Sequence, residues 1–351
     1  MALNSHSRMK KIKGALLAGT LLAGALLTAC SSGDSGADSS GGTSDAAVES
    51  LALKVAFNQD ATHPQAVAIE KFGEDLEEAT DGRYSIDLYT DELLGAQAET
   101  IEMVQAGSVE MAFIIGSLME NFNPDYAVLS LPYMYESSDH MMSALNDMDV
   151  VGDLYSSTSA DGIQVLRTFY AGQRNLYTTK EIKEPADMAG LKLRVPGSQL
   201  GIDIINAMGG SGTPMAFGEV YTAIQSGVID GAENNEVPYA DMGHSEVAQF
   251  YNYTQHQIIP DILIINPAVL EAMSEEDRET FQTLLDEAVA YEYSLYAEKI
   301  EESIVKSKDV GATFNTDVDQ DAFKELLAPV RESYLTTDSA RTLYEAIVAA
   351  A

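Results

Sequence analysis

The chain has 351 residues, and its 55 Asp and Glu residues against 20 Lys and Arg residues give a formal net charge of −35. This negative charge argues against nucleic acid and against anionic lipid surfaces as partners, because both are themselves negative. Cys30 is the only cysteine, so no disulfide forms within the chain. The roughly 300 residues that follow the leader described below are enough for two domains rather than one.

Residues 1–30 have the pattern of a secretory signal peptide. Basic residues precede an apolar run of about fifteen residues, which is too short for a stable membrane span. The run ends in Leu27-Thr28-Ala29-Cys30, which resembles the lipobox of bacterial lipoproteins. The resemblance implies cleavage before Cys30 and attachment of lipid to its thiol; the alternative is a free cysteine in a core. We therefore expect an extracytoplasmic protein that is lipid-anchored to the cell membrane.

Residues 31–47 consist almost entirely of Ser, Gly, Asp and Ala. Such a segment does not bury enough apolar surface to offset the entropy lost on ordering, which predicts a flexible tether. No later apolar run is as long as a membrane helix.

Strand and helix patterns alternate along most of the remaining chain. This alternation implies parallel strand pairing and an α/β sheet with helices on both faces. The predicted strands cover 53–57, 83–89, 109–115, 163–170, 191–195, 214–217 and 228–234, and the predicted helices cover about 65–80, 95–106, 198–208 and 218–226.

A longer helix is predicted to begin after Ser274, a serine cap followed by three acidic residues. Its apolar periodicity continues to Ile304, and neither Gly nor Pro occurs before Gly311. A helix of thirty-odd residues is roughly 50 Å long, which exceeds the width of one domain of this size. The segment is therefore either two helices with an unrecognised break or one helix that joins two α/β lobes.

Motifs of the common enzyme classes do not occur in the sequence. HExxH, CxxC, GxSxG and GxxxxGK[ST] are all missing, and the five histidines lack metal-ligand spacing. The Gly-rich run 209–212 follows a predicted helix rather than a strand, so we interpret it as a helix exit turn. We expect neither a metal nor another cofactor, and an enzymatic function has no positive support.

Two arginines stand just after or at the end of predicted strands. Arg174 lies in AGQRNLY and Arg194 in LKLRVPGS. In open α/β sheets ligands bind beyond these strand ends, and the planar guanidinium suits a carboxylate. By spacing alone, a structural ion pair with one of the many acids explains each arginine at least as well.

Residues 190–234 closely resemble the signature region of the solute-binding proteins of tripartite ATP-independent periplasmic (TRAP) transporters, in the DctP-like family. The stretch reads GLKLRVPGSQLGIDIINAMGGSGTPMAFGEVYTAIQSGVIDGAEN. Similarity extends to FNQDATHPQAVAIEKFGEDLEEATDGRYSIDLY, LLGAQAETIEMVQAGSVEMAF and LSLPYMYES, and so covers most of 52–310.

This resemblance implies a two-lobed periplasmic-binding-protein-like α/β fold with a ligand cleft. It implies a domain I formed by 48–171 plus 260–299, a domain II formed by 172–259 plus 300–351, and a long helix shared by both. It also implies a receptor that binds a small organic acid without changing it. The partner is then a TRAP permease, which uses an ion gradient rather than ATP.

The resemblance also assigns ligand-binding residues. Arg194 matches the arginine that pairs with the ligand's carboxylate, and Arg174 matches a second cationic contact. Asn234 matches a ligand-contacting asparagine, Phe217 an aromatic that packs on the ligand, and Asn58 a polar contact from the opposite lobe. The alternatives are that Phe217 belongs to the core, Asn234 caps the next segment and Asn58 is a turn residue.

A sugar acid such as a uronate or aldonate is the expected ligand class. Ile114-Ile115 stand where sialic-acid-binding members carry a glutamate, which argues against sialic acid. His63, at the end of the first polar loop, and His244, after GAENN, resemble the sugar-acid branch. Gln97 falls where that branch often has an acid, and we expect it to contact a sugar hydroxyl. A C4-dicarboxylate or another organic acid, a sensor role with a signalling partner, and a sugar-acid enzyme such as a lyase remain open.

Overall fold

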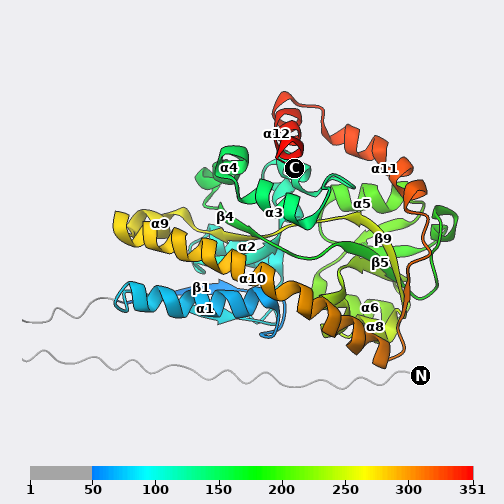
Figure 1. The fold of residues 1–351 in the computed structure, drawn as a ribbon, viewed down its shortest axis with the longest axis horizontal. Helices are drawn as coiled ribbons and strands as arrows, with labels where there is room; N and C mark the ends of the chain where they lie inside the picture. The colour runs from blue at the N-terminus through cyan, green and yellow to red at the C-terminus, as the bar shows by residue number, and fades with distance from the viewer. Residues whose placement is uncertain (1–49, 351) are drawn as a thin grey trace, which may run out of the picture. The chain divides into compact units, whose positions relative to one another are not determined.

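A computed structural model describes residues 50–350, whose strands form two separate sheets (Figure 1). The strand orders are β2-β1-β3-β10-β4 and β11-β9-β5-β8-β6-β7. The predicted signal peptide, Cys30 and the predicted tether lie outside the described residues. No helix of the described part is both long and apolar enough to cross a membrane.

The first sheet contains the predicted parallel strands and one strand of opposite direction. The strands β1 (Leu51–Ala56), β2 (Tyr84–Tyr89) and β3 (Met111–Ile115) are parallel and alternate with α1 (Pro64–Ala79) and α2 (Gln97–Gln105). Strand β10 (Asp261–Ile265) runs antiparallel between β3 and β4 (Gln164–Phe169). All residues of β3 are buried, because helices cover the sheet. This sheet with α1, α2 and η1 (Gly116–Asn121) is called the first lobe.

The second sheet is also mixed. Strand β6 (Lys192–Val195) is parallel to β7 (Ser211–Pro214) and β8 (Gly231–Asn234). Strand β5 (Arg174–Thr178) is antiparallel to β8 and to β9 (Phe250–Gln257), and β11 (Thr313–Asn315) pairs with β9. This sheet with α5 (Gln199–Ala207), α6 (Val220–Gln225) and α7 (Glu236–Asp241) is called the second lobe.

The prediction of a strand at 214–217 is wrong in its bounds, because the strand lies about three residues earlier in the chain. Strand β7 ends at Pro214, and Phe217 begins a 3-10 helix, η5 (Phe217–Glu219). The Gly-rich run is only partly an exit turn: Gly209 has φ of +100°, and Ser211 already starts β7. Because β7 is an edge strand without a buried residue, its sequence lacks the apolar alternation that marks a strand.

The long helix α10 (Glu275–Asp309) is one uninterrupted helix of 35 residues, which confirms the one-helix alternative. Ser274 Oγ caps it by accepting a hydrogen bond from the Asp277 amide at 3.0 Å. The helix packs against α1 and β4 of the first lobe (Figure 1) and against α7 of the second. Its Lys299 Nζ donates to Thr62 Oγ1 of the first lobe at 3.2 Å and forms a salt bridge with Asp241 of α7 at 3.0 Å.

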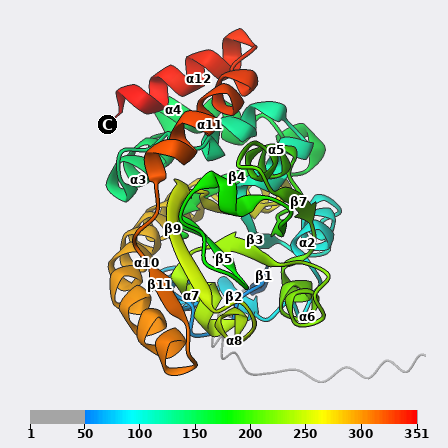
Figure 2. The same cartoon turned by 90° about the vertical axis from the view of Figure 1, so that its right-hand side faces the viewer.

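The chain crosses between the sheets at 170–173, at 258–260 and again through α10 to β11, so neither sheet is formed by one continuous stretch. The predicted division into two domains stays a prediction. Helix α11 (Gln320–Tyr334) packs on α5 and β9, whereas α12 (Asp338–Ala349) packs on η2 (Pro124–Ser130), α3 (Ser138–Asn146) and α4 (Met148–Ser156) (Figure 2). The remaining helices are α8 (His244–Val247), α9 (Pro267–Ala272), η3 (Ser159–Asp161) and η4 (Pro185–Met188).

Candidate functional site

A cavity has walls from both lobes. All the ligand-binding residues expected from the sequence line it: Asn58, His63, Gln97, Arg174, Arg194, Phe217 and Asn234. The structure thus brings together residues from six elements or loops, while their contact with a ligand stays a prediction.

Arg194 is a buried cation that forms no salt bridge within residues 50–350. It lies in β6, next to the Pro196 that ends the strand, and its side chain is 5% exposed. Its Nε donates to the Met215 carbonyl oxygen at 2.9 Å, which is its only hydrogen bond to residues 50–350, and it forms no salt bridge with them. The two Nη groups are therefore available to a ligand.

Burial lowers the pKa of Arg194 to about 10, so it is still protonated at neutral pH. The guanidinium carbon lies 5.5 Å from the ring centroid of Phe217, in cation–π distance. A buried, uncompensated cation is costly unless an anion pairs with it. The electrostatics of this wall therefore favour an anionic ligand group.

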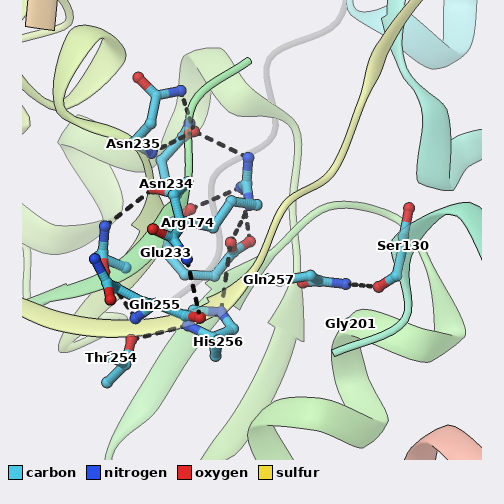
Figure 3. Close-up of polar contacts among 12 residues, drawn as sticks. Ser130, Arg174, Gly201, Glu233, Asn234, Asn235, Thr254, Gln255, His256 and Gln257 are labelled. Atoms are coloured by element: carbon cyan, nitrogen blue, oxygen red, sulfur yellow. Dashed lines mark hydrogen bonds and ion pairs between the residues drawn. The ribbon is translucent and has the colours of Figure 1, made fainter. Parts of the chain in front are cut away.

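Arg174, in contrast, is fully paired inside the protein (Figure 3). Its Nε and Nη2 both donate to the carboxylate of Glu233, and Nη2 lies 2.8 Å from Oε1. Nη2 also donates to the Glu233 carbonyl oxygen at 2.8 Å. Burial alone would lower the pKa of Arg174, but the charge and hydrogen bonds of Glu233 outweigh burial and raise it. The structural ion pair that spacing allowed therefore exists at Arg174.

His256 of β9 completes this buried cluster. Its Nδ1 shares a hydrogen bond with Thr254 Oγ1 at 2.8 Å, and its Nε2 lies 4.0 Å from Glu233 Oε2 (Figure 3). Burial, assisted by the nearby Arg174 charge, lowers the pKa of His256 to about 3, so the ring is neutral at physiological pH. The Arg174–Glu233 pair thus remains the charged centre of this wall.

Asn234 is oriented by that cluster. Its Oδ1 accepts hydrogen bonds from Arg174 Nη1 at 2.9 Å and from the Asn235 amide at 2.9 Å. Because Oδ1 is occupied, the Nδ2 group is the part of Asn234 that remains to donate into the cavity. The capping role considered for Asn234 belongs to its neighbour: Asn235 Oδ1 accepts from the Val237 amide at the start of α7.

Apart from Asp261 of β10, the polar groups of the first-lobe wall are neutral. Asn58 and Gln59 follow β1, and Gln97 begins α2; none of these amide side chains forms a hydrogen bond within residues 50–350. His63 caps α1, since its Nδ1 accepts from the Gln65 amide at 3.3 Å. Burial lowers the pKa of His63 to about 4, which keeps it uncharged. Amides and a neutral imidazole suit hydroxyl groups, which both donate and accept.

Eight lining residues were not predicted from the sequence, and two of them lie far along the chain from the others. Asp261 begins β10, and Tyr296 lies near the middle of α10. They come from segments outside the quoted motifs, and no local pattern sets them apart from other acids and tyrosines. His244 does not line the cavity: its Nδ1 bonds the Tyr177 hydroxyl at 2.8 Å, and its ring packs edge-on against Phe217 at 5.4 Å. His244 supports Phe217 from behind.

Comparison with known proteins places this architecture in a family. Residues 55–337 match the profile of the DctP family, described as bacterial extracellular solute-binding protein, family 7. A solute-binding protein of Chromohalobacter salexigens is 34% identical over 276 residues, which cover 78% of this chain and 82% of that protein.

Two solved structures of TRAP periplasmic solute-binding proteins are similar. One, from Anaerococcus prevotii with bound α/β-D-glucuronate, has a TM-score of 0.82 and 34% identity, and the match covers 85% of this chain and 97% of that one. The other, from Xanthobacter autotrophicus with bound β-D-galacturonate, has a TM-score of 0.81, 27% identity and coverage of 85% and 99%. The chain belongs to the DctP family of bacterial extracellular solute-binding proteins, the receptors of TRAP transporters.

Proposed function

We propose that this receptor binds a sugar monocarboxylate of the hexuronate type, such as glucuronate or galacturonate, in the cavity between its lobes. The observation that carries the proposal is Arg194, a buried guanidinium with free Nη groups and no protein counter-ion within residues 50–350. The bound uronates of the two similar structures support the ligand class.

In the proposed complex the second lobe holds the charge of the ligand. The carboxylate pairs with both Nη groups of Arg194, and such charge-assisted, bidentate hydrogen bonds are the strongest that a carboxylate forms. Phe217 packs on the ligand from the side of that guanidinium. Asn234 Nδ2 donates to a ligand oxygen, held in place by the Arg174–Glu233 pair.

The first lobe then recognises the hydroxyl groups. Asn58, Gln59 and Gln97 offer amides that have no partner within residues 50–350. A ligand hydroxyl can donate a hydrogen bond to the amide oxygen or accept one from the amide nitrogen. An apolar ligand would instead leave the amide buried and unpaired, at a cost of about 1–3 kcal/mol. Closing the lobes about the hinge segments 170–173 and 258–260 buries the ligand and presents the closed receptor to the permease.

The experiment is a thermal-shift and calorimetric screen of the purified protein. The panel is D-glucuronate, D-galacturonate, D-gluconate, succinate, L-malate and N-acetylneuraminate. A ligand at 100 times its dissociation constant stabilises the protein by about 2.7 kcal/mol, which raises the melting temperature by a few degrees. Binding of uronates is the expected result. Binding confined to C4-dicarboxylates would refute the sugar-acid proposal and leave the receptor function intact.

We also propose the lipid anchor on Cys30, which the sequence pattern supports. Its test is labelling of growing cells with a radioactive fatty acid. The wild-type protein should incorporate label, and Cys30→Ser should not. Equal labelling of both proteins, or of neither, would refute the anchor.

A further inference from the structure

Asp261 is an acid in a cavity that is otherwise suited to an anion. It is the first residue of β10, in register with Ile115 of β3, and both residues line the cavity. No salt bridge within 4.0 Å joins Asp261 to Arg194 or to any other cation of residues 50–350. The acid is therefore not simply the missing counter-ion of Arg194.

The two carboxylate oxygens of Asp261 have different surroundings. Oδ2 accepts a hydrogen bond from Gln65 Nε2 at 3.1 Å, and the same Nε2 donates to the Tyr170 carbonyl oxygen at 3.0 Å. The side chain is thus held from α1 in a fixed orientation. Oδ1 forms no hydrogen bond within the described residues, so it is the carboxylate oxygen of this lining residue that is left to accept one from a ligand.

The charges of the two walls therefore differ in sign. In the second lobe Arg174 is neutralised by Glu233, which leaves Arg194 as the uncompensated cation of the lining. In the first lobe, the carboxylate of Asp261 is an acidic group in the lining of the cavity. A ligand that fills this cavity must offer an anionic group to Arg194 and a hydrogen-bond donor to Asp261.

We propose that Asp261 is a specificity-determining residue, which accepts a hydrogen bond from a ligand hydroxyl and rejects ligands that carry a second carboxylate. The inference deepens the proposed function and rests on it. An ionised carboxylate only accepts hydrogen bonds, and hydroxyl-to-carboxylate bonds are short and strong. A second ligand carboxylate has no proton to donate and meets a like charge, which weakens binding in a desolvated site.

The substrate class that follows is a polyhydroxylated monocarboxylate. A hexuronate has one carboxylate for Arg194 and several hydroxyls for Asp261 and the first-lobe amides. A C4-dicarboxylate or a hexarate places a second negative charge in the same cavity. Burial raises the pKa of Asp261 to about 6, against the opposing effects of Gln65 and Arg174, so the group is mainly ionised at pH 7 and able to discriminate.

The test is calorimetric titration at pH 7.5 with D-glucuronate and with D-glucarate, which carries a second carboxylate on the same carbon skeleton. Three proteins are compared: wild type, Asp261→Asn, and Asp87→Asn. In the first variant the asparagine side chain keeps the shape of the aspartate and loses its charge. Asp87 is an exposed residue of β2 outside the cavity, so its variant controls for the change in net charge.

The wild type should bind glucuronate at least about 100-fold more tightly than glucarate. Asp261→Asn should weaken glucuronate binding roughly 10- to 100-fold and reduce the glucuronate preference at least tenfold, while Asp87→Asn behaves as wild type. A glucuronate preference that survives Asp261→Asn unchanged would overturn this inference alone. If the wild type binds no glucuronate, the proposed function falls and this inference with it.

Discussion

The two walls of the cavity are built in opposite ways. In the second-lobe wall, Arg174, Glu233 and Asn234 bond one another, and the Nη groups of Arg194 and Nδ2 of Asn234 remain open within residues 50–350. In the first-lobe wall, the side-chain amides of Asn58, Gln59 and Gln97 make no hydrogen bonds within residues 50–350. In the proposed complex, the second lobe is therefore prepared for one charged group before the ligand arrives, and the first lobe adapts to hydroxyls as the lobes close.

This difference assigns unlike roles to two arginines of the same lobe. Arg174 and Arg194 both line the cavity and both are at least 95% buried. Arg174 has its charge cancelled by Glu233 and mainly positions Asn234, whereas Arg194 retains its charge for the ligand. Disrupting the environment of Arg174 should therefore mainly lower the stability of the fold, whereas substituting Arg194 should mainly lower ligand affinity.

The largest effect is expected from Glu233→Gln. The variant leaves Arg174 as a buried cation without its partner, and such a loss usually costs about 3–5 kcal/mol of folding free energy. Chemical denaturation should show the lower stability directly. Asp286→Asn, which breaks the half-exposed pair with Arg167, is the matched control and should cost less than about 1 kcal/mol. Equal losses of folding free energy in both variants would contradict the inference that the buried Arg174–Glu233 pair is the more important of the two for stability.

Arg194→Lys should reduce ligand affinity at least about tenfold, or about 1.4 kcal/mol, with little loss of stability. Lysine keeps the charge but has no planar fork to bind a carboxylate through two parallel bonds. Calorimetric titration with D-glucuronate measures the change. Unchanged affinity would refute the carboxylate clamp.

Asp261→Asn should stabilise the ligand-free protein at pH 7, by up to about 3 kcal/mol. The pKa of Asp261 is raised to about 6 in the fold, above its unfolded value near 3.8, so the folded state binds more protons between these values. The stability contribution of this group is therefore fully present below about pH 4 and is lost as the pH rises through 6. The stabilising effect of Asn should accordingly vanish near pH 4, and an effect that does not depend on pH would contradict the assignment.

A smaller effect is expected from Glu120→Gln. Glu120 belongs to η1 of the first lobe, and its carboxylate accepts a hydrogen bond from the Gln199 amide at the start of α5 in the second lobe. A negative charge at a helix N-terminus contributes about 0.3–1 kcal/mol, so the closed form should lose roughly two- to fivefold in ligand affinity. Glu102→Gln, at an exposed position of α2, should have no effect. Equal affinities in both variants would exclude this contact between the lobes as a determinant of closure.

Sequence reasoning succeeded where the periodicity was strong or a motif was continuous. The parallel strands β1, β2 and β3 and the single long helix α10 follow from apolar spacing, which records burial directly. Strand β9, with the sequence FYNYTQHQ, escaped prediction because a buried tyrosine, an asparagine and a histidine replace the usual aliphatic residues. Several of its polar side chains, such as Asn252, bond partners that only the fold brings near.

The candidate site was likewise predictable in part. The expected residues meet in one cavity, yet their sequence did not reveal which arginine is paired. With 55 acids available, only the antiparallel pairing of β5 with β8 places Glu233 beside Arg174. Asp261 was missed for the same reason, because β10 reaches the cavity only after the chain has crossed back into the first sheet.

The most direct test of the central claim compares D-glucuronate with D-glucuronamide, in which a neutral amide replaces the carboxylate. Both ligands carry the same ring hydroxyls, so they differ only in the group assigned to Arg194. The account predicts that the amide binds the wild type at least about 100-fold more weakly, and that Arg194→Lys narrows this difference. Equal binding of the two ligands by the wild type would show that recognition does not depend on pairing of the carboxylate with Arg194.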